Sequence, residues 1–281
     1  MIYGYDKLVK TFKGLAAKDN LSHGYIFFGE SEIGKATFAR CLANFMEFGE
    51  FTESNHVLTE CLNIKPDFKE SDGIIGIDAI RDIKQFLYAL PVNSKRRIVL
   101  IQDAEALTAQ AENAILKIAE EPPKSGLLIL IVANPDSLIP TLQSRFQKIY
   151  FPRLSTAAVK KFLLDEMKVS VKEATHAAEL SFGRVGRAKN IVSSKDSDDL
   201  SKEVSKFLKS GSYQKDLIKK MVEPENKHKL GTFLNEVVAN LYLDMDKNYP
   251  LLKALVSRLT LMGQFNLNKR LQLETSLIWT T

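Results

Sequence analysis

Three short apolar runs in the first half of the chain lack the alternation of polar and apolar residues that marks a half-exposed strand. They lie at residues 25–28, 98–101 and 127–132. Continuous runs of this length are typical of strands buried on both faces, as in a parallel sheet that helices cover. With a further strand predicted at residues 148–151, the pattern indicates a buried parallel sheet in the first half of the chain.

Helical periodicity occupies two of the segments between these runs, because apolar residues recur there every three or four positions up to a proline. They are Ile77, Ile80, Ile83 and Leu87, followed by Pro91, and Ala111, Ala114, Ile115 and Ile118, followed by Pro122 and Pro123. Strands that alternate with helices predict an α/β domain, which we expect to span residues 1–152.

Beyond residue 152 the strand-like runs stop and helical periodicity continues. Residues 153–195 fit three short helices, and the polar residues 193–199 are the expected linker to the last part of the chain. Residues 196–281 contain longer amphipathic stretches, which predict a helical bundle. One such stretch carries Leu230, Phe233, Leu234, Val237 and Leu241.

The composition favours a globular protein of two or three small units, since 281 residues with 45% hydrophobic positions supply ample core. Two cysteines, Cys41 and Cys61, are too few for a disulfide framework, and the longest apolar run is too short to cross a membrane. We therefore expect a cytoplasmic protein without membrane contact. The net charge of +5 is spread along the chain. Its one tight basic cluster, residues 95–97, is expected to be a solvated segment before a strand rather than a DNA-binding patch.

A candidate phosphate-binding loop follows the first predicted strand. It consists of Gly29, Glu30, Ser31, Glu32, Ile33, Gly34 and Lys35, and a helix should begin at its end. Such glycines let backbone N–H groups surround phosphate oxygens, whose charge the lysine neutralises. A functional loop places a hydroxyl for Mg²⁺ directly after the lysine, where this chain has Ala36, and Thr37 comes about 100° further around the helix. The loop therefore indicates either a tight turn without nucleotide or weak binding of ATP or ADP.

The strand at residues 98–101 ends where a P-loop ATPase carries its second set of catalytic groups. Active enzymes place an aspartate for the metal there, followed by a glutamate that orients the attacking water. This chain has Gln102 and Asp103 at the two positions. Gln102 supplies no anionic metal ligand, and Asp103 is shorter than the expected glutamate. We therefore expect no ATP hydrolysis at this site.

Three segments together resemble the bacterial clamp-loader subunits of the AAA+ class, which belong to DNA polymerase III. They run from Ser22 to Gly29, from Asn113 to Pro123 and from Ser144 to Phe146. The middle segment is similar to the family's Asn-Ala-Leu-Leu-Lys-x-x-Glu-Glu-Pro-Pro, a highly specific pattern. The resemblance covers the first two thirds of the chain well. Asn266 and the helix that follows it also resemble the end of the family's last domain, less specifically.

The resemblance implies an AAA+ α/β domain at residues 1–152, a small helical lid at 153–195 and a helical collar at 196–281 that joins subunits in a ring. It implies gamma/tau and delta subunits as partners in a hetero-oligomer, with the sliding clamp and primer-template DNA reached through the complex. Ser144 and Arg145 fall on the family's Ser-Arg-Cys motif, whose arginine enters the ATP site of a neighbouring subunit. Phe146 replaces the cysteine.

Within this family, the pattern of losses resembles that of the delta-prime subunit, which helps to load the clamp without hydrolysing ATP. The losses are Ala36, Gln102, Ala133 at the first-sensor position and Gly186 at the second, with Asn134 and Arg187 one place away from the two sensors. Arg145, which would serve a neighbour, remains. Two alternatives stay open, an ATP-hydrolysing motor subunit of the gamma/tau type or another AAA+ ATPase, and a stand-alone nucleic-acid-binding module.

The family often carries a four-cysteine zinc module between the phosphate loop and the second strand, and this chain departs from it. Only Cys61, with His56 nearby, lies in that region. Because structural zinc needs about four ligands, we predict no zinc, and we expect residues 49–76 to form an ordinary loop. The side chains expected to pack this loop are Phe51, Leu58 and Phe68.

Overall fold

The chain forms two compact units, each with its own apolar core. The computed structural model describes residues 2–54, 56–66, 73–193, 203–208, 211–223, 227–264 and 267–278. Unit 1 contains Met1–Lys168 and Phe182–Arg187, and unit 2 contains Val169–Ser181 and Ala188–Thr281. Each unit is described by itself below.

Unit 1 is built on a five-stranded sheet in which all paired strands are parallel. The strands are β1 (Gly24–Phe28), β2 (Cys61–Ile64), β3 (Arg97–Ile101), β4 (Gly126–Val132) and β5 (Gln147–Tyr150), in the spatial order β2-β3-β4-β1-β5. Phe28 at the end of β1 is in register with Val132 of β4 and Tyr150 of β5. The four strands predicted from the apolar runs are confirmed, whereas β2 was not predicted.

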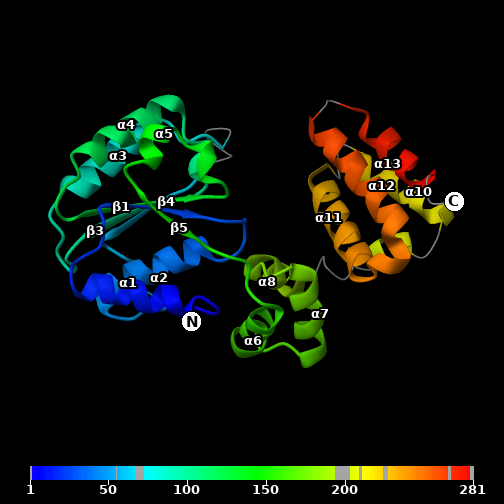
Figure 1. Ribbon diagram of the computed structural model, residues 1–281, viewed down its shortest axis with the longest axis horizontal. Coiled ribbons are helices and arrows are strands. Elements are labelled where there is room, and N and C mark those ends of the chain that lie inside the picture. The colour runs from blue at the N-terminus through cyan, green and yellow to red at the C-terminus, as the bar shows by residue number, and fades with distance from the viewer. Residues whose placement is uncertain are drawn as a thin grey trace. The chain divides into compact units, whose positions relative to one another are not determined.

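Helices cover both faces of this sheet, so that unit 1 has three layers (Figure 1). On one face lie α1 (Asp6–Ala17) and α2 (Lys35–Phe48), and on the other α3 (Ile77–Tyr88), α4 (Ala109–Glu120) and α5 (Pro140–Gln143). Two short 3₁₀ turns, η1 (Ala104–Ala106) and η2 (Pro135–Ser137), follow β3 and β4. The predicted α/β class with a parallel sheet is confirmed.

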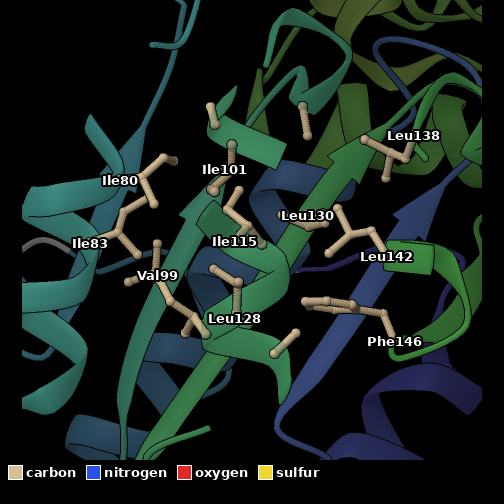
Figure 2. Close-up of a cluster of buried hydrophobic side chains, with 14 of the residues drawn as sticks. Ile80, Ile83, Val99, Ile101, Ile115, Leu128, Leu130, Leu138, Leu142 and Phe146 are labelled. Carbon is tan, nitrogen blue, oxygen red and sulfur yellow. The ribbon is translucent and has the colours of Figure 1, made fainter. Parts of the chain in front are cut away.

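The core between the sheet and the layer of α3, α4 and α5 explains the sequence pattern of these elements (Figure 2). Its side chains include Ile80 and Ile83 of α3, Ile115 of α4, Val99 of β3 and Leu128 of β4. β4 is buried along its whole length, which is why its seven residues show no polar alternation. Removing such an aliphatic side chain from water is worth about 1.5–3 kcal/mol. The apolar runs are therefore the residues that hold the layers together.

Three short helices follow the sheet, as predicted for residues 153–195. They are α6 (Thr156–Glu166), α7 (Val171–Ser181) and α8 (Val185–Ser193). The hydroxyl of Ser155 caps α6 by accepting a hydrogen bond from the Ala158 N–H at 3.2 Å. Of the predicted linker at residues 193–199, Ser193 is the last residue of α8 and the rest lies outside the described residues. The division into three domains stays a prediction.

The C-terminal helices form a bundle, as their periodicity predicts. They are α10 (Gly211–Val222), α11 (Lys227–Leu243), α12 (Met245–Gln264) and α13 (Lys269–Ile278). All five apolar positions expected along one helix face, from Leu230 to Leu241, are buried in the core of unit 2. Asn266 lies outside the described residues. None of the helices that the structure describes is both long and apolar enough to span a bilayer.

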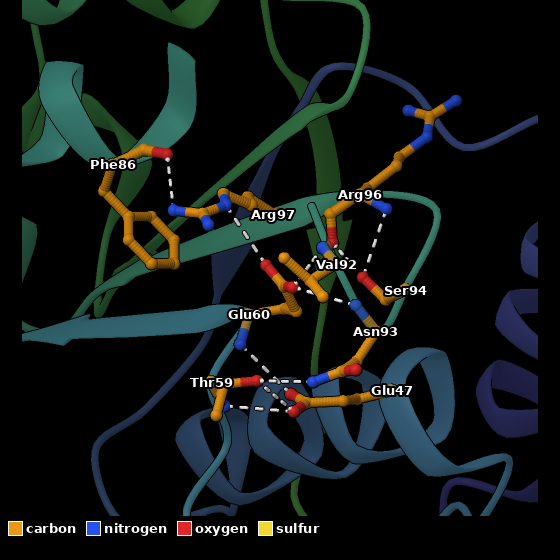
Figure 3. Close-up of polar contacts among 9 residues, drawn as sticks. All are labelled: Glu47, Thr59, Glu60, Phe86, Val92, Asn93, Ser94, Arg96 and Arg97. Carbon is orange, nitrogen blue, oxygen red and sulfur yellow. Dashed lines mark hydrogen bonds and ion pairs between the residues drawn. The ribbon is translucent and has the colours of Figure 1, made fainter. Parts of the chain in front are cut away.

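Arg96 and Arg97 are not solvated, contrary to the expectation for the basic cluster, because both side chains have partners within unit 1. Nη1 of Arg96 donates to a backbone carbonyl before β1 at 2.9 Å. Nε of Arg97 lies 3.1 Å from Oε2 of Glu60, an ion pair without hydrogen-bond geometry, and its guanidinium stacks on the Phe86 ring at 4.7 Å (Figure 3). The Glu60 side chain is only 4% exposed, and a buried carboxylate needs a cation. The fold itself requires Arg97, and Lys95 alone of the cluster is exposed.

Residues 49–76 contain a strand, β2, so the expectation of an ordinary loop was wrong. Phe51 is buried there, Leu58 is half-buried, and Phe68 lies outside the described residues. The Glu47 carboxylate at the end of α2 accepts hydrogen bonds from the N–H and the hydroxyl of Thr59, at 3.1 and 2.6 Å (Figure 3). These bonds attach the segment before β2 to α2. That the chain binds no zinc stays a prediction.

Candidate functional site

The candidate phosphate-binding loop is a tight turn at the carboxyl end of β1, leading directly into α2. Gly29 and Gly34 have φ values of +138° and +100°, a region that L residues with a side chain rarely adopt. A Cβ on Gly29 would also lie 2.4 Å from the carbonyl oxygen of Phe151. Within the loop, Ile33 is buried and Ser31 is exposed. The two glycines are therefore required for the turn itself, whether or not a phosphate binds.

The Lys35 ammonium is bonded to the loop that it would serve. Its side chain is buried, and Nζ donates to the carbonyl oxygens of Gly29 and of Glu30, the latter at 2.6 Å. Burial lowers the pKa of Lys35, while the nearby carboxylates of Glu105 and Asp103 act in the opposite direction. Two of the three N–H donors of the ammonium are thus engaged, and a phosphate group would share the charge with these carbonyl partners.

In the first turn of α2, Thr37 carries the hydroxyl next to Ala36, and this hydroxyl has a partner within the helix. The Thr37 hydroxyl accepts a hydrogen bond from Nη2 of Arg40 at 3.3 Å, and the same nitrogen pairs with Glu53 at 2.8 Å. Arg40 lies one turn further along α2, so the hydroxyl is engaged there. That Thr37 does not replace the missing magnesium ligand stays a prediction.

At the end of β3, Gln102 turns to the edge of the sheet. Its Nε2 donates to Oδ1 of Asn63 in β2 at 2.7 Å. Asp103 has a φ of +48° and begins the η1 turn. The carboxylate close to the first-sensor position belongs to Glu105, which accepts a hydrogen bond from the Ala133 N–H. No local spacing indicates Glu105, because Glu105 follows β3 whereas its partner Ala133 follows β4.

The backbone at both sensor positions contacts the phosphate-loop region, and at Gly186 this contact leaves little room for a side chain. The carbonyl of Ala133 accepts from the Gly29 N–H at 3.2 Å, and Asn134 caps the η2 turn. The Gly186 N–H donates to the Glu32 carbonyl at 2.7 Å, and a Cβ on Gly186 would lie 2.9 Å from the Cβ of Glu32. A larger residue at position 186 would therefore disturb this contact with the loop.

Arg153 adds a charge to the loop that no sequence motif indicated. Its Nη2 and Nε lie 2.6 and 2.8 Å from Oε1 of Glu30. The hydrogen bond from Arg153 lowers the pKa of Glu30. The Tyr5 hydroxyl lies 2.9 Å from the carbonyl oxygens of both Ile33 and Pro152, which share its single hydrogen as acceptors. These contacts connect the loop to residues before β1 and to residues after β5.

The donor set of this site does not fit a hydrolysable Mg²⁺–nucleotide. Magnesium is held by a hydroxyl and a carboxylate in P-loop ATPases, and the corresponding positions here are Ala36 and Gln102, whose amide already donates to Asn63. Lys35 remains the one cation of the motif. Only the phosphate-binding part of the chemistry has its residues in place.

Arg145 follows α5, in the helix layer on the opposite face of the sheet from α2, and lies between two buried anchors. Leu142, at 0% exposure, and Phe146, at 6%, insert into the core beside β4 (Figure 2). The Arg145 side chain is 35% exposed, and its Nη2 pairs with Oε1 of Glu120 at 2.8 Å. Its Nη1 donates to the carbonyl of Thr141 at 2.9 Å. An exposed ion pair of this kind contributes about 0.2–1 kcal/mol to stability.

Ser144 supports this turn and does not carry chemistry of its own in the structure. Its hydroxyl donates to the carbonyl of Thr141 at 2.9 Å, and its backbone follows the last residue of α5. The Arg145 N–H donates to the Leu142 carbonyl at 3.2 Å. Of these two residues after α5, Ser144 bonds to the turn itself and Arg145 presents a partly exposed charged group.

The three segments Ser22–Gly29, Asn113–Pro123 and Ser144–Phe146 lie next to one another in unit 1. A Cβ on Gly24 would lie 2.3 Å from the Phe146 ring, so the glycine makes space for the aromatic side chain. The His23 ring lies 6.0 Å from the Phe146 ring, edge to face. A small cavity next to them is lined by Pro122 and Pro123 of the Asn113–Pro123 segment. The three segments therefore pack together around Phe146, the residue that follows Arg145.

A family model described as DNA polymerase III, delta subunit, matches residues 4–155. The chain belongs to this family. The matched residues include the phosphate-loop turn, the end of β3 and the Ser144–Phe146 segment, and they make up more than half of the chain. The match confirms the resemblance to the bacterial clamp-loader subunits of DNA polymerase III.

Relatives within DNA polymerase III include both a delta-prime and a gamma/tau subunit. The delta-prime subunit of Bacillus subtilis is 26% identical over 211 residues, which cover 72% of this chain and 63% of that protein. The gamma/tau subunit of Mycobacterium tuberculosis is 28% identical over 153 residues, which cover 51% of this chain and 26% of that protein. The chain thus spans about a quarter to a third of the length of the gamma/tau relatives that it matches.

Solved structures share the fold at lower identity. A mutant of RuvB from Thermotoga maritima aligns with a TM-score of 0.50 and 16% identity, over 92% of this chain and 83% of that chain. This likeness concerns the fold alone. The AAA+ arrangement expected from the family resemblance is in agreement with it and with the strand order of unit 1.

Proposed function

We propose that this chain is a clamp-loader subunit of the delta-prime type, which hydrolyses no ATP and supplies Arg145 to the ATP site of a neighbouring subunit. The observation that carries the proposal is a contrast within unit 1. The Lys35 side chain is buried and bonded to its own loop, and Gln102 is bonded to Asn63, whereas the Arg145 guanidinium, although paired with Glu120, is 35% exposed between two buried anchors. The chain lacks the metal-binding residues for ATP hydrolysis at its own loop and retains the arginine that would act at the ATP site of a neighbouring subunit.

An arginine suits this role because its guanidinium is always charged and presents five N–H donors in a planar fork. Phosphoryl transfer places negative charge on the γ-phosphoryl oxygens, which such a fork stabilises. Two of the five N–H groups of Arg145 bond to Glu120 and Thr141. The others are available to a phosphate brought by a neighbouring subunit.

The partners proposed are the gamma/tau and delta subunits, in a hetero-oligomeric ring formed through the collar. The sliding clamp and primer-template DNA would be reached through this complex in the cytoplasm. A nucleotide in the chain's own loop is not required for this function. Weak binding of ATP or ADP there is compatible with it, since Lys35 is present.

The test is Arg145→Ala in an otherwise intact complex with gamma/tau and delta, followed by DNA-stimulated ATP hydrolysis and by assembly on a sizing column. Arginine fingers are worth roughly 10³–10⁵ in rate at a single site, and further ATP sites in the ring dilute that loss. We expect assembly to survive and turnover to fall. The control is Lys148→Ala, which removes a nearby exposed cation. Unchanged turnover in an assembled Arg145→Ala complex would falsify the proposal.

The gamma/tau relatives favour one alternative, an ATP-hydrolysing motor subunit. That function requires a magnesium-dependent turnover by the chain itself, with Lys35 as an essential group. Measuring ATP hydrolysis of the isolated chain and of Lys35→Ala separates the two. A rate that depends on Mg²⁺ and disappears in the variant would establish the motor.

A further inference from the structure

We propose that Glu120 is a positioning residue for Arg145, orienting its guanidinium toward the nucleotide of the neighbouring subunit by accepting a hydrogen bond. The inference rests on the proposed function of Arg145 and adds a second residue to that site. Glu120 belongs to the Asn113–Pro123 segment, and Arg145 to the Ser144–Phe146 segment. The pair therefore connects two of the segments by which the family was recognised.

The guanidinium of Arg145 is fixed by acceptors from two different elements. Oε1 of Glu120, at the end of α4, lies 2.8 Å from Nη2. The carbonyl of Thr141, within α5, lies 2.9 Å from Nη1. Because the guanidinium is planar, bonds to both terminal nitrogens prevent rotation of the fork unless one of them breaks. Nε and one N–H on each terminal nitrogen remain for a phosphate.

The two elements that carry these acceptors are held in a fixed relation. Ile115 of α4 and Leu142 of α5 are both fully buried in the same core (Figure 2). The carboxylate of Glu112, also in α4, accepts a hydrogen bond from the Ile139 N–H at the start of α5, at 3.2 Å. The distance between the backbones of Glu120 and Arg145 is thus set by packing, which preorganises the pair.

The position of Glu120 in its helix is unfavourable unless a cation is present. It is the last residue of α4, where the carbonyl end of the helix disfavours a carboxylate and favours a cation. Arg145 brings such a cation to this end. Glu121 follows immediately and is exposed, and no bond of its carboxylate is seen among the described residues. The neighbouring glutamate is therefore a matched control for charge in this segment.

The contribution of Glu120 is orientation rather than charge, because both side chains are partly solvated. Glu120 is 46% exposed and Arg145 is 35% exposed, so solvent screens their attraction. A neutral amide at position 120 offers the same acceptor atom without the charge. The geometry consequently predicts that Glu120→Gln preserves the orientation of the Arg145 guanidinium and that Glu120→Ala does not.

The experiment measures DNA-stimulated ATP hydrolysis by the assembled complex as a function of ATP concentration. We expect Glu120→Ala to lower kcat about two- to fivefold, the upper part of the range over which one exposed pair changes an equilibrium, with KM unchanged. Glu120→Gln and the control Glu121→Ala should match the wild type. In an Arg145→Ala background, Glu120→Ala should have no further effect, because it acts through the arginine.

The outcomes separate this inference from the proposed function. If Arg145→Ala lowers kcat but Glu120→Ala does not, only the positioning role is overturned. A higher kcat in Glu120→Ala would also overturn it, since Glu120 would then be withholding the arginine. If Arg145→Ala itself has no effect, the finger and its positioning residue both fall. Should Glu120→Ala fail to assemble, Glu120→Asp keeps the charge, shifts the acceptor, and is expected to lower kcat in its place.

Discussion

Gly24→Ala tests whether the first strand carries a glycine in order to make space for Phe146. An ideal Cβ at this position lies 2.3 Å from both Cδ1 and Cε1 of the ring, whereas ordinary van der Waals contact begins near 3.4 Å. The ring would have to withdraw by more than an ångström. Gly24 does not have a positive φ, so alanine causes no backbone strain and the clash alone is tested.

The ring has little freedom to withdraw, which sets the magnitude. Phe146 is only 6% exposed and packs in the core with Leu128 and Leu142 (Figure 2). Adding a methyl group to a well-packed core costs about 1–3 kcal/mol, and we expect Gly24→Ala to lower the free energy of unfolding by this amount. The matched control is Gly14→Ala in α1, where a Cβ meets nothing within 4 Å. It should stabilise the chain by about 0.5–1 kcal/mol.

Native-state hydrogen exchange of the β1 and β4 amides is the suitable assay, because the two units need not unfold together. It reports the opening free energy of the sheet directly. The double variant Gly24→Ala with Phe146→Ala removes the clash. Its loss of stability should therefore be smaller than the combined losses of the two single variants. Strict additivity, or a Gly24→Ala variant as stable as the wild type, would refute the reasoning.

Three further predictions concern the phosphate-loop turn and the region after α2. The isolated chain should show no magnesium-dependent ATP turnover above background, and a rate abolished by Lys35→Ala would contradict this. Elemental analysis should find no stoichiometric zinc, because residues 49–76 hold a single cysteine, and about one zinc per chain would overturn the prediction. Arg153→Ala should lower stability at neutral pH by no more than about 1 kcal/mol, since the pair is partly exposed. Because Arg153 lowers the folded-state pKa of Glu30, this difference should disappear in urea titrations as the pH falls through that pKa, and a difference that persists in acid would argue against the ion pair.

The strands show which parts of the sheet the local pattern of apolar and polar residues can predict. β4 is buried on both faces, so its position is visible as an unbroken apolar run. β2 was missed because it is a four-residue edge strand that contains Asn63 and is only half-buried. A short strand of this kind has neither the continuous apolar run nor the alternation by which strands are recognised. It exists because β3 offers it backbone partners.

The basic cluster at residues 95–97 shows that a local pattern does not predict the partners of charged residues either. From the sequence, Arg97 is one of three neighbouring cations before a strand. In the structure it neutralises the buried Glu60, which lies 37 positions earlier in the chain and is held by backbone N–H groups of Val92 and Asn93. No local spacing connects the two residues. The Glu60 carboxylate comes close to Arg97 only when β2 pairs with β3.

The sequence by itself determined the α/β class, the shape of the phosphate-loop turn and the losses in its chemistry. These depend on residue types at fixed local spacing, because Ala36 lacks a hydroxyl and Gly29 tolerates a positive φ however the rest of the chain folds. Only the tertiary structure decided that the Lys35 ammonium bonds the loop carbonyls and that Glu120 pairs with Arg145. The last two residues are 25 positions apart, and the packing of α4 and α5 on one sheet brings them together. Such distant partners follow from the folded arrangement of whole elements, which local patterns do not encode.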